Sequence, residues 1–294
     1  MKLFILAIIF ISPFNSSLSQ QIADDEFVSA YVIESPKHTP GEGPVIMIDG
    51  GHNNFHTLEG RFSPFAKMLE KDGYILRSND SPITKEILDG CRIYVISNAL
   101  NDTNANGRWY LPTPSAFTVE EMAAIRDWVN DGGRLFLIAD HMPFPGAAEE
   151  LAAHFRFGFT NGFEMGTQFP TVFRKSDGTL SESPVTEGID SVVSFTGQAF
   201  IVPRDDASIM TFGPGHINLL ADTAWQFNVN TDTTLAEGMS QGAIMDYGKG
   251  KLAIFGEAAM FTAQTSEGEK FGFNSPLAPQ NVQFLLNVIH WLEE

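Results

Sequence analysis

The segment from Arg134 to Gly146 places an apolar run directly before a polar turn and a helix. Residues 135–139 are Leu-Phe-Leu-Ile-Ala, and the turn that follows opens with Asp140 and His141. A continuous apolar run of this kind is typical of a strand buried on both faces of a parallel sheet. Ligands of open α/β sheets bind beyond the carboxyl ends of such strands. Asp140 and His141 therefore stand where chemistry is expected.

The alternation of strand and helix recurs along the chain. Strands are predicted at 45–48, 74–76, 93–97 and 134–139, and helices at 62–69, 118–129 and 146–154. Gly248-Lys249-Gly250 predicts a β-hairpin, and an apolar stripe from Val282 to Leu292 predicts a closing helix. This rhythm indicates a doubly wound, mostly parallel α/β sheet with helices on both faces. We expect the first strand of that sheet to lie beside the fourth.

The ends of the chain suggest its domain organisation. Residues 1–19 have the pattern of a secretory signal peptide: Lys2, a short apolar stretch, and small residues before Gln20. The protein is therefore expected to be exported, to a periplasmic or extracellular location, with no membrane insertion of the mature chain. Residues 20–43 are an N-terminal extension. Residues 44–294 are predicted to form one domain, with an insertion of irregular or antiparallel strands at about 155–224.

Charge and cysteine usage exclude several function classes. The formal net charge is −18, from 36 acidic and 18 basic residues, which argues against nucleic acid as a partner. The sequence contains no phosphate-binding glycine loop, so no nucleotide cofactor is expected. Cys91 is the only cysteine, and an intramolecular disulfide is impossible. Because Cys91 precedes the strand at 93–97, we interpret it as a small half-buried residue rather than a nucleophile.

Four segments resemble the class I glutamine amidotransferase-like superfamily: residues 48–53, 128–141, 250–257 and 281–291. The resemblance is to uncharacterised domains of the DUF4350 type and, more distantly, to ThuA-like domains. It implies a flavodoxin-like fold. True glutamine amidotransferases carry a nucleophilic cysteine at the turn occupied here by Asp140, His141 and Met142, so cysteine-dependent glutamine hydrolysis is excluded. Relatives with a histidine there imply a sugar-active or ligand-binding protein.

The histidines and carboxylates after the strands form the main candidate site. His52 and His56 follow the first strand, and we expect them to meet Asp140 and His141 at the carboxyl edge, joined by Asp49 and Glu257. One hypothesis is a divalent metal such as zinc, held by His52, His56 and His141. A second is metal-free catalysis by His141, Asp140 and Glu257. A third is a structural role for the histidines.

Other residues are candidates for substrate binding. Trp109 and Tyr110 lie on the loop after the third strand and offer aromatic faces to a ring. Arg61 could bind a substrate carboxylate through both its amino groups, with a salt bridge as the competing use. Asn53 lies between the two histidines.

Residues 102–107 match the first half of a calcium loop. Thr113 stands where the loop needs a glutamate, which makes calcium less favoured than zinc and a polar turn the preferred interpretation.

Together these patterns predict an exported hydrolase acting on a small or carbohydrate-derived substrate, with metal assistance as an open alternative. The competing hypothesis is a non-catalytic ligand- or carbohydrate-binding module on the same fold.

Overall fold

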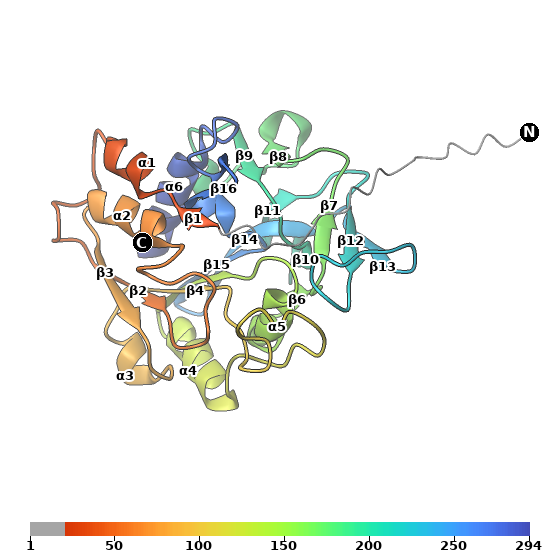
Figure 1. Ribbon diagram of the computed structural model, residues 1–294. Helices are drawn as coiled ribbons and strands as arrows, with labels where there is room; N and C mark the ends of the chain where they lie inside the picture. The colour runs from red at the N-terminus through yellow and green to blue at the C-terminus, as the bar shows by residue number, and fades with distance from the viewer. Residues whose placement is uncertain (1–20) are drawn as a thin grey trace, which may run out of the picture.

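The computed structural model describes residues 21–294 and shows a central sheet with helices on both sides (Figure 1). The predicted signal peptide lies outside the described residues. The helices are α1 (Asp25–Ala30), α2 (Ser63–Lys71), α3 (Lys85–Leu88), α4 (Val119–Asn130), α5 (Phe144–His154) and α6 (Asn281–Glu293). Short 3-10 helices lie at Lys175–Asp177, Pro184–Thr186, Asp205–Ala207 and Ala259–Phe261.

The strands fall into two groups, those that pair within the central sheet and those that pair in smaller sheets. Those of the central sheet are β2 (Val45–Asp49), β3 (Ile75–Asn79), β4 (Ile93–Ser97), β5 (Arg134–Ile138), β6 (Gly158–Phe159), β10 (Phe200–Ile201), β11 (Ser208–Thr211), β14 (Ser240–Tyr247) and β15 (Gly250–Phe255). The others are β1 (Ile22–Ala23), β7 (Phe163–Met165), β8 (Thr171–Arg174), β9 (Ser191–Ser194), β12 (Ile217–Leu220), β13 (Asp232–Leu235), β16 (Ala263–Ser266) and β17 (Glu269–Gly272).

The parallel part of the sheet has flavodoxin-like topology. Its strands are ordered β3-β2-β4-β5-β15, and each pair in this row is parallel. Numbered along the chain, that is the order 2-1-3-4-5 of flavodoxin-like doubly wound folds. The predicted α/β fold class is confirmed. The expectation that the first strand lies beside the fourth is wrong, because β4 lies between β2 and β5.

Each face of the sheet has its own apolar core, because successive side chains on a strand point to opposite faces. Ile46 and Ile48 belong to the core under α2 and α6, whereas Met47 belongs to the core under α4 and α5. The stripe predicted for the last helix is buried in the first core. Figure 1 shows α1, α2 and α6 on one side of the sheet and α3, α4 and α5 on the other.

Residues 155–224 contain antiparallel strands. β7 and β12 form a small antiparallel sheet with β13, which lies beyond this segment, and β8 pairs with β9. The segment also extends the main sheet, because β10 pairs with β14 and β6, and β11 pairs with β14. The predicted hairpin is formed by β14 and β15, and β15 is also the fifth parallel strand.

The extension at 20–43 joins the domain through β1 and α1. β1 pairs with β16, and Val28 of α1 is fully buried in the core beneath α2. Across residues 21–294, no helix combines the length and the apolar character that crossing a bilayer requires.

Candidate functional site

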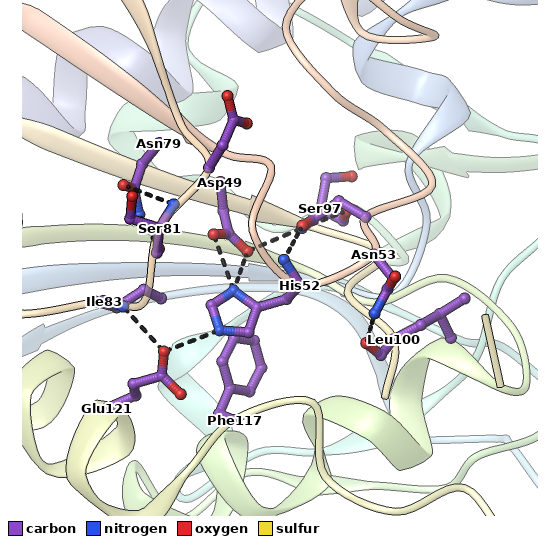
Figure 2. Close-up of polar contacts among 12 residues, drawn as sticks. Asp49, His52, Asn53, Asn79, Ser81, Ile83, Ser97, Leu100, Phe117 and Glu121 are labelled. Atoms are coloured by element: carbon purple, nitrogen blue, oxygen red, sulfur yellow. Dashed lines mark hydrogen bonds and ion pairs between the residues drawn. The ribbon is translucent and has the colours of Figure 1, made fainter. Parts of the chain in front are cut away.

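His52 lies between two carboxylates at the carboxyl end of β2. Its Nδ1 is 2.9 Å from Asp49 Oδ2 and its Nε2 is 3.0 Å from Glu121 Oε1. Figure 2 shows the imidazole bridging these two side chains, with Phe117 packed against it. All three side chains are at least nine-tenths buried. His52 therefore acts as a buried cross-link between the loop after β2 and helix α4.

The charges of this group favour a doubly protonated His52. Burial alone lowers the pKa of His52, but the hydrogen bonds and charges of Asp49 and Glu121 outweigh it, and the net pKa is raised. Burial also raises the pKa of Glu121, and the N–H groups of Thr118 and Ile83 reverse this, so that its net pKa is lowered. A protonated ring donates from both nitrogens, which matches the two carboxylate partners.

His56 occupies a different environment on the other side of β4. Its Nδ1 is 3.1 Å from Ser97 Oγ, and its ring stacks on Phe62 at 4.6 Å. The buried Nε2 has no hydrogen-bond partner among the described residues. Burial, and then the positive charges of Arg61 and His141, lower the pKa of His56 to about 3. His56 is therefore neutral and lies within electrostatic range of His141.

His141 is 7% exposed, and one of its two ring nitrogens has no protein partner among the described residues. Its Nδ1 is 2.8 Å from the Met142 carbonyl, which fixes Nδ1 as the protonated nitrogen of the neutral ring. Nε2 has no protein partner among the described residues and is not one of their buried unpaired atoms, so it reaches solvent. The ring stacks on Phe163 at 4.6 Å with an interplanar angle of 14°. A histidine with an oriented ring and a free Nε2 is suited to accept a proton.

Asp140 and Glu257 form an acidic pair beside His141. Asp140 Oδ1 accepts hydrogen bonds from the His141 backbone N–H at 2.8 Å and from Thr196 Oγ1 at 3.1 Å. Glu257 is fully buried, and its carboxyl accepts from the N–H groups of Ala259 and Met260. Burial, followed by the charge of Asp140, raises the pKa of Glu257 well above its usual value.

The structure thus divides the predicted cluster into two groups. His52 bridges Asp49 of β2 and Glu121 of α4, whereas His56, Asp140, His141 and Glu257 lie over β4, β5 and β15. No hydrogen bond or ring contact joins His52 to His56 or His141 within residues 21–294. Both histidines follow the same strand, and the course of the loop after β2 separates them: His52 packs on Phe117, whereas His56 stacks on Phe62.

The residues assigned to substrate binding have different environments. Trp109 is half-buried, with its ring 6.1 Å from that of His141. Tyr110 is 45% exposed and forms an isolated β-bridge with Thr223. Asn53 donates to Asp102 Oδ1 at 2.9 Å, away from the imidazoles. Arg61 lies 3.9 Å above the Phe55 ring, has no salt bridge among the described residues, and has a buried, unpartnered Nε.

The metal hypothesis remains a prediction. Both nitrogens of His52 face carboxylates, so in this arrangement His52 has none to offer a metal alongside His56 and His141. Between residues 21 and 294, no three His, Cys, Asp or Glu side chains are grouped as metal ligands. In the loop at residues 102–107, for which a polar turn is the preferred interpretation, the Asn104 side chain donates to the carbonyls of Arg108, Tyr110 and Pro112 and so holds the loop together.

Cys91 lies at the amino-terminal end of β4, at the opposite edge of the sheet from His141. Burial, and then the charge of Asp89, raise the pKa of its thiol to about 12. A thiol with so high a pKa is a poor nucleophile at neutral pH.

Several residues of the site were not singled out from the sequence. Glu121 forms a capping box with Thr118 at the start of α4, and its contact with His52 has no local sequence signal. Asn98 has a positive φ of 50° at the end of β4, and its side chain accepts the Asp140 N–H at 2.9 Å. An asparagine directly after a buried strand was the signal available for it. Thr196, Phe163 and Trp225 come from the insertion, and no local pattern marks them.

Two surface pockets lie elsewhere on the protein. One, of about 430 Å³, is lined by Phe27, Tyr31 and Phe273 among others. The other, of about 400 Å³, lies beside Lys37 and His290. Neither is lined by the residues around His141.

The comparisons with known proteins identify similar folds. No protein-family model matches the chain, and no curated protein matches it. Among solved structures, the N-terminal domain of mmIFT52 is 16% identical with a TM-score of 0.60, covering 85% of this chain and 97% of that one. The cytoplasmic protein STM1381 from Salmonella typhimurium LT2 is 15% identical with a TM-score of 0.51, covering 85% of this chain and 99% of that one.

A ThuA-like protein from Bacteroides uniformis ATCC 8492 is 13% identical with a TM-score of 0.47, covering 90% of this chain and 94% of that one. At these identities, the likeness to mmIFT52 and STM1381 concerns the fold alone. The weaker likeness to the ThuA-like protein supports no further statement.

Proposed function

We propose that this protein is a hydrolase acting on a small or carbohydrate-derived substrate, with His141 as its general base. The observation that supports this most directly is the pairing of His141 Nδ1 with the Met142 carbonyl, which leaves Nε2 unprotonated and open to solvent. In the proposed reaction, a water molecule gives a proton to Nε2 as its oxygen attacks the electrophilic carbon. The proton then passes from Nε2 to the leaving oxygen.

The acidic pair would support that proton transfer. When His141 accepts a proton, the neighbouring carboxylate of Asp140 stabilises the imidazolium. Glu257 is fully buried and cannot touch substrate, so its proposed role is to hold a proton beside Asp140. Two carboxyl groups whose environments differ this strongly are typical of acid/base sites. Arg61, with no salt bridge among the described residues, is the proposed contact for a substrate carboxylate.

We also propose that the chain is a relative of the class I glutamine amidotransferase-like superfamily, of the DUF4350 type, that lacks the nucleophilic cysteine, and that it is exported. The 2-1-3-4-5 strand order and the histidine-bearing turn after β5 support the first proposal. Residues 1–19 alone support export. Bound zinc remains an open proposal, and elemental analysis of protein purified without a metal-binding tag would measure it.

The hydrolase proposal can be tested with a panel of 4-nitrophenyl esters and 4-nitrophenyl glycosides. We expect His141→Ala to abolish turnover, because within residues 21–294 no other imidazole beside Asp140 has an unpartnered nitrogen that reaches solvent. His154→Ala is the control, since His154 lies at the end of α5 and should leave turnover unchanged. Equal activity of His141→Ala and the parent protein would rule His141 out as the base.

The second candidate function is a non-catalytic binding module. Complete burial of Glu257 favours it, because a carboxyl that cannot reach substrate cannot act on it directly. A ligand that binds the parent and His141→Ala equally, with no turnover of any panel member by the parent, would establish this alternative.

A further inference from the structure

Trp225 is an exposed aromatic side chain held against the imidazole of His141. The two ring centroids are 4.6 Å apart at an angle of 71°. Trp225 also makes an edge contact with Phe163, the residue on which His141 stacks. Even so, 43% of Trp225 remains exposed. The exposed part of the Trp225 ring therefore lies at the surface directly beside His141.

The backbone at Trp225 is fixed in an unfavourable conformation. Its φ is 64°, in the left-handed region that glycine adopts easily and a bulky residue rarely does. It lies in a tight turn in which the Gln226 N–H donates to the Thr223 carbonyl at 3.1 Å. Strained positions of this kind are concentrated at ligand sites, where the fold around them enforces the geometry.

The surrounding chain holds this turn against the loop after β4. The Leu111 N–H donates to the Asp222 carbonyl at 2.9 Å, and the Ala224 N–H donates to the Trp109 carbonyl at 2.8 Å. An isolated β-bridge joins Tyr110 to Thr223 between these two bonds. Trp225 is therefore positioned next to His141 before any ligand arrives.

We infer that Trp225 is a stacking platform for a pyranose ring of the substrate, supplied to the His141 site by the insertion. A pyranose carries an apolar face of C–H groups and a rim of hydroxyls. Trp225 suits the apolar face, and the solvent-facing Nε2 of His141 and the carboxylate of Asp140 suit the hydroxyl rim. The inference rests on the proposed hydrolase function and names the class of its substrate.

The test is direct binding of cellobiose, measured by saturation-transfer-difference NMR, with sorbitol as the acyclic control. We expect cellobiose but not sorbitol to bind the parent protein. Trp225→Gly should weaken cellobiose binding about tenfold or more, as expected for the loss of one stacking contact. Trp225→Phe should retain most of the affinity. Val229→Ala is the matched control, because Val229 is 95% exposed and lies four residues along the same segment.

The midpoint of thermal unfolding distinguishes a ligand-stacking role of Trp225 from a purely structural one. Glycine relieves the backbone strain at φ 64°, so we expect the midpoint of Trp225→Gly to stay within a few degrees of the parent. A lower midpoint with unchanged cellobiose affinity would show that the Trp225 ring only packs against His141 and Phe163. Failure of cellobiose to bind the parent, or binding of benzyl alcohol in its place, would also overturn the inference.

These outcomes are distinct from those that test the hydrolase proposal. Cellobiose binding that depends on Trp225, without turnover of any ester or glycoside in the panel, would support the stacking platform and overturn the hydrolase proposal. Turnover that depends on His141 but is unaffected by Trp225→Gly would support the hydrolase proposal and overturn the stacking platform.

Discussion

His52 Nε2 and Glu121 Oε1 lie 3.0 Å apart, although 69 positions separate the two residues in the chain. The same glutamate closes the capping box of α4 through Thr118 and accepts the Ile83 N–H at 2.9 Å. One carboxylate therefore fixes the start of a helix, the loop after β2 and the segment after β3. This relation explains why a helix-capping residue is buried here.

Glu121→Gln should destabilise the protein much more than loss of a cap alone. An N-terminal capping interaction is worth about 1 kcal/mol, whereas breaking a buried ion pair costs about 3–5 kcal/mol. We expect a loss of roughly 2–4 kcal/mol, since the amide keeps part of the hydrogen bonding. Urea unfolding at pH 7 measures it. Glu120→Gln is the control, because the exposed neighbouring carboxylate should contribute less than about 0.5 kcal/mol.

Stability should fall as pH rises through the folded pKa of His52. Its pKa is raised above the ordinary 6.5, so the folded protein binds this proton more tightly than the unfolded chain does. The stabilisation is complete below pH 6.5 and disappears as pH rises through the folded value. Free energies of unfolding between pH 6 and 9 should fall less for His52→Gln than for the parent. Parallel curves for the two proteins would contradict a charged His52.

His56 should make the folded protein less stable as the pH falls, whereas His52 makes it less stable as the pH rises. Because its folded pKa is about 3, the unfolded chain binds the proton first as pH falls below 6.5. Stability is lost over that window with a slope of up to about 1.4 kcal/mol per pH unit. His56→Leu should reduce the loss between pH 6.5 and 3. An NMR titration that finds His56 protonated in the folded protein at pH 5 would contradict this expectation.

The pKa of Glu257 should fall when the charge of Asp140 is removed. Burial is the larger cause of the raised value and remains in Asp140→Asn, so the pKa should move down without returning to normal. Carboxyl ¹³C NMR across pH 4–9 measures it. Thr196→Val is a useful comparison, because it removes only a hydrogen bond to Asp140 Oδ1 and keeps the charge. An unchanged pKa in Asp140→Asn would mean that the two carboxyls do not interact.

Local sequence patterns were sufficient for the α/β architecture. The apolar run before Asp140 marks β5, the Thr118–Glu121 spacing marks the start of α4, and the stripe from Val282 marks α6. Each depends on residues that are neighbours along the chain, where backbone geometry fixes which side chains share a face. The position of Asp140 and His141 at a carboxyl edge follows from the same local rule.

Tertiary structure alone decided which of those side chains meet. The course of the loop after β2 turned His52 toward Glu121 and placed His56 against Ser97 of β4. The neighbours of His141 that come from the insertion, Phe163, Trp225 and Thr196, reach it through pairings between distant segments. Strand order and long-range packing depend on the free energy of the whole chain rather than on any short window of residues. Local sequence patterns therefore indicate which residues lie at the carboxyl edge, and the tertiary structure decides which of them are in contact.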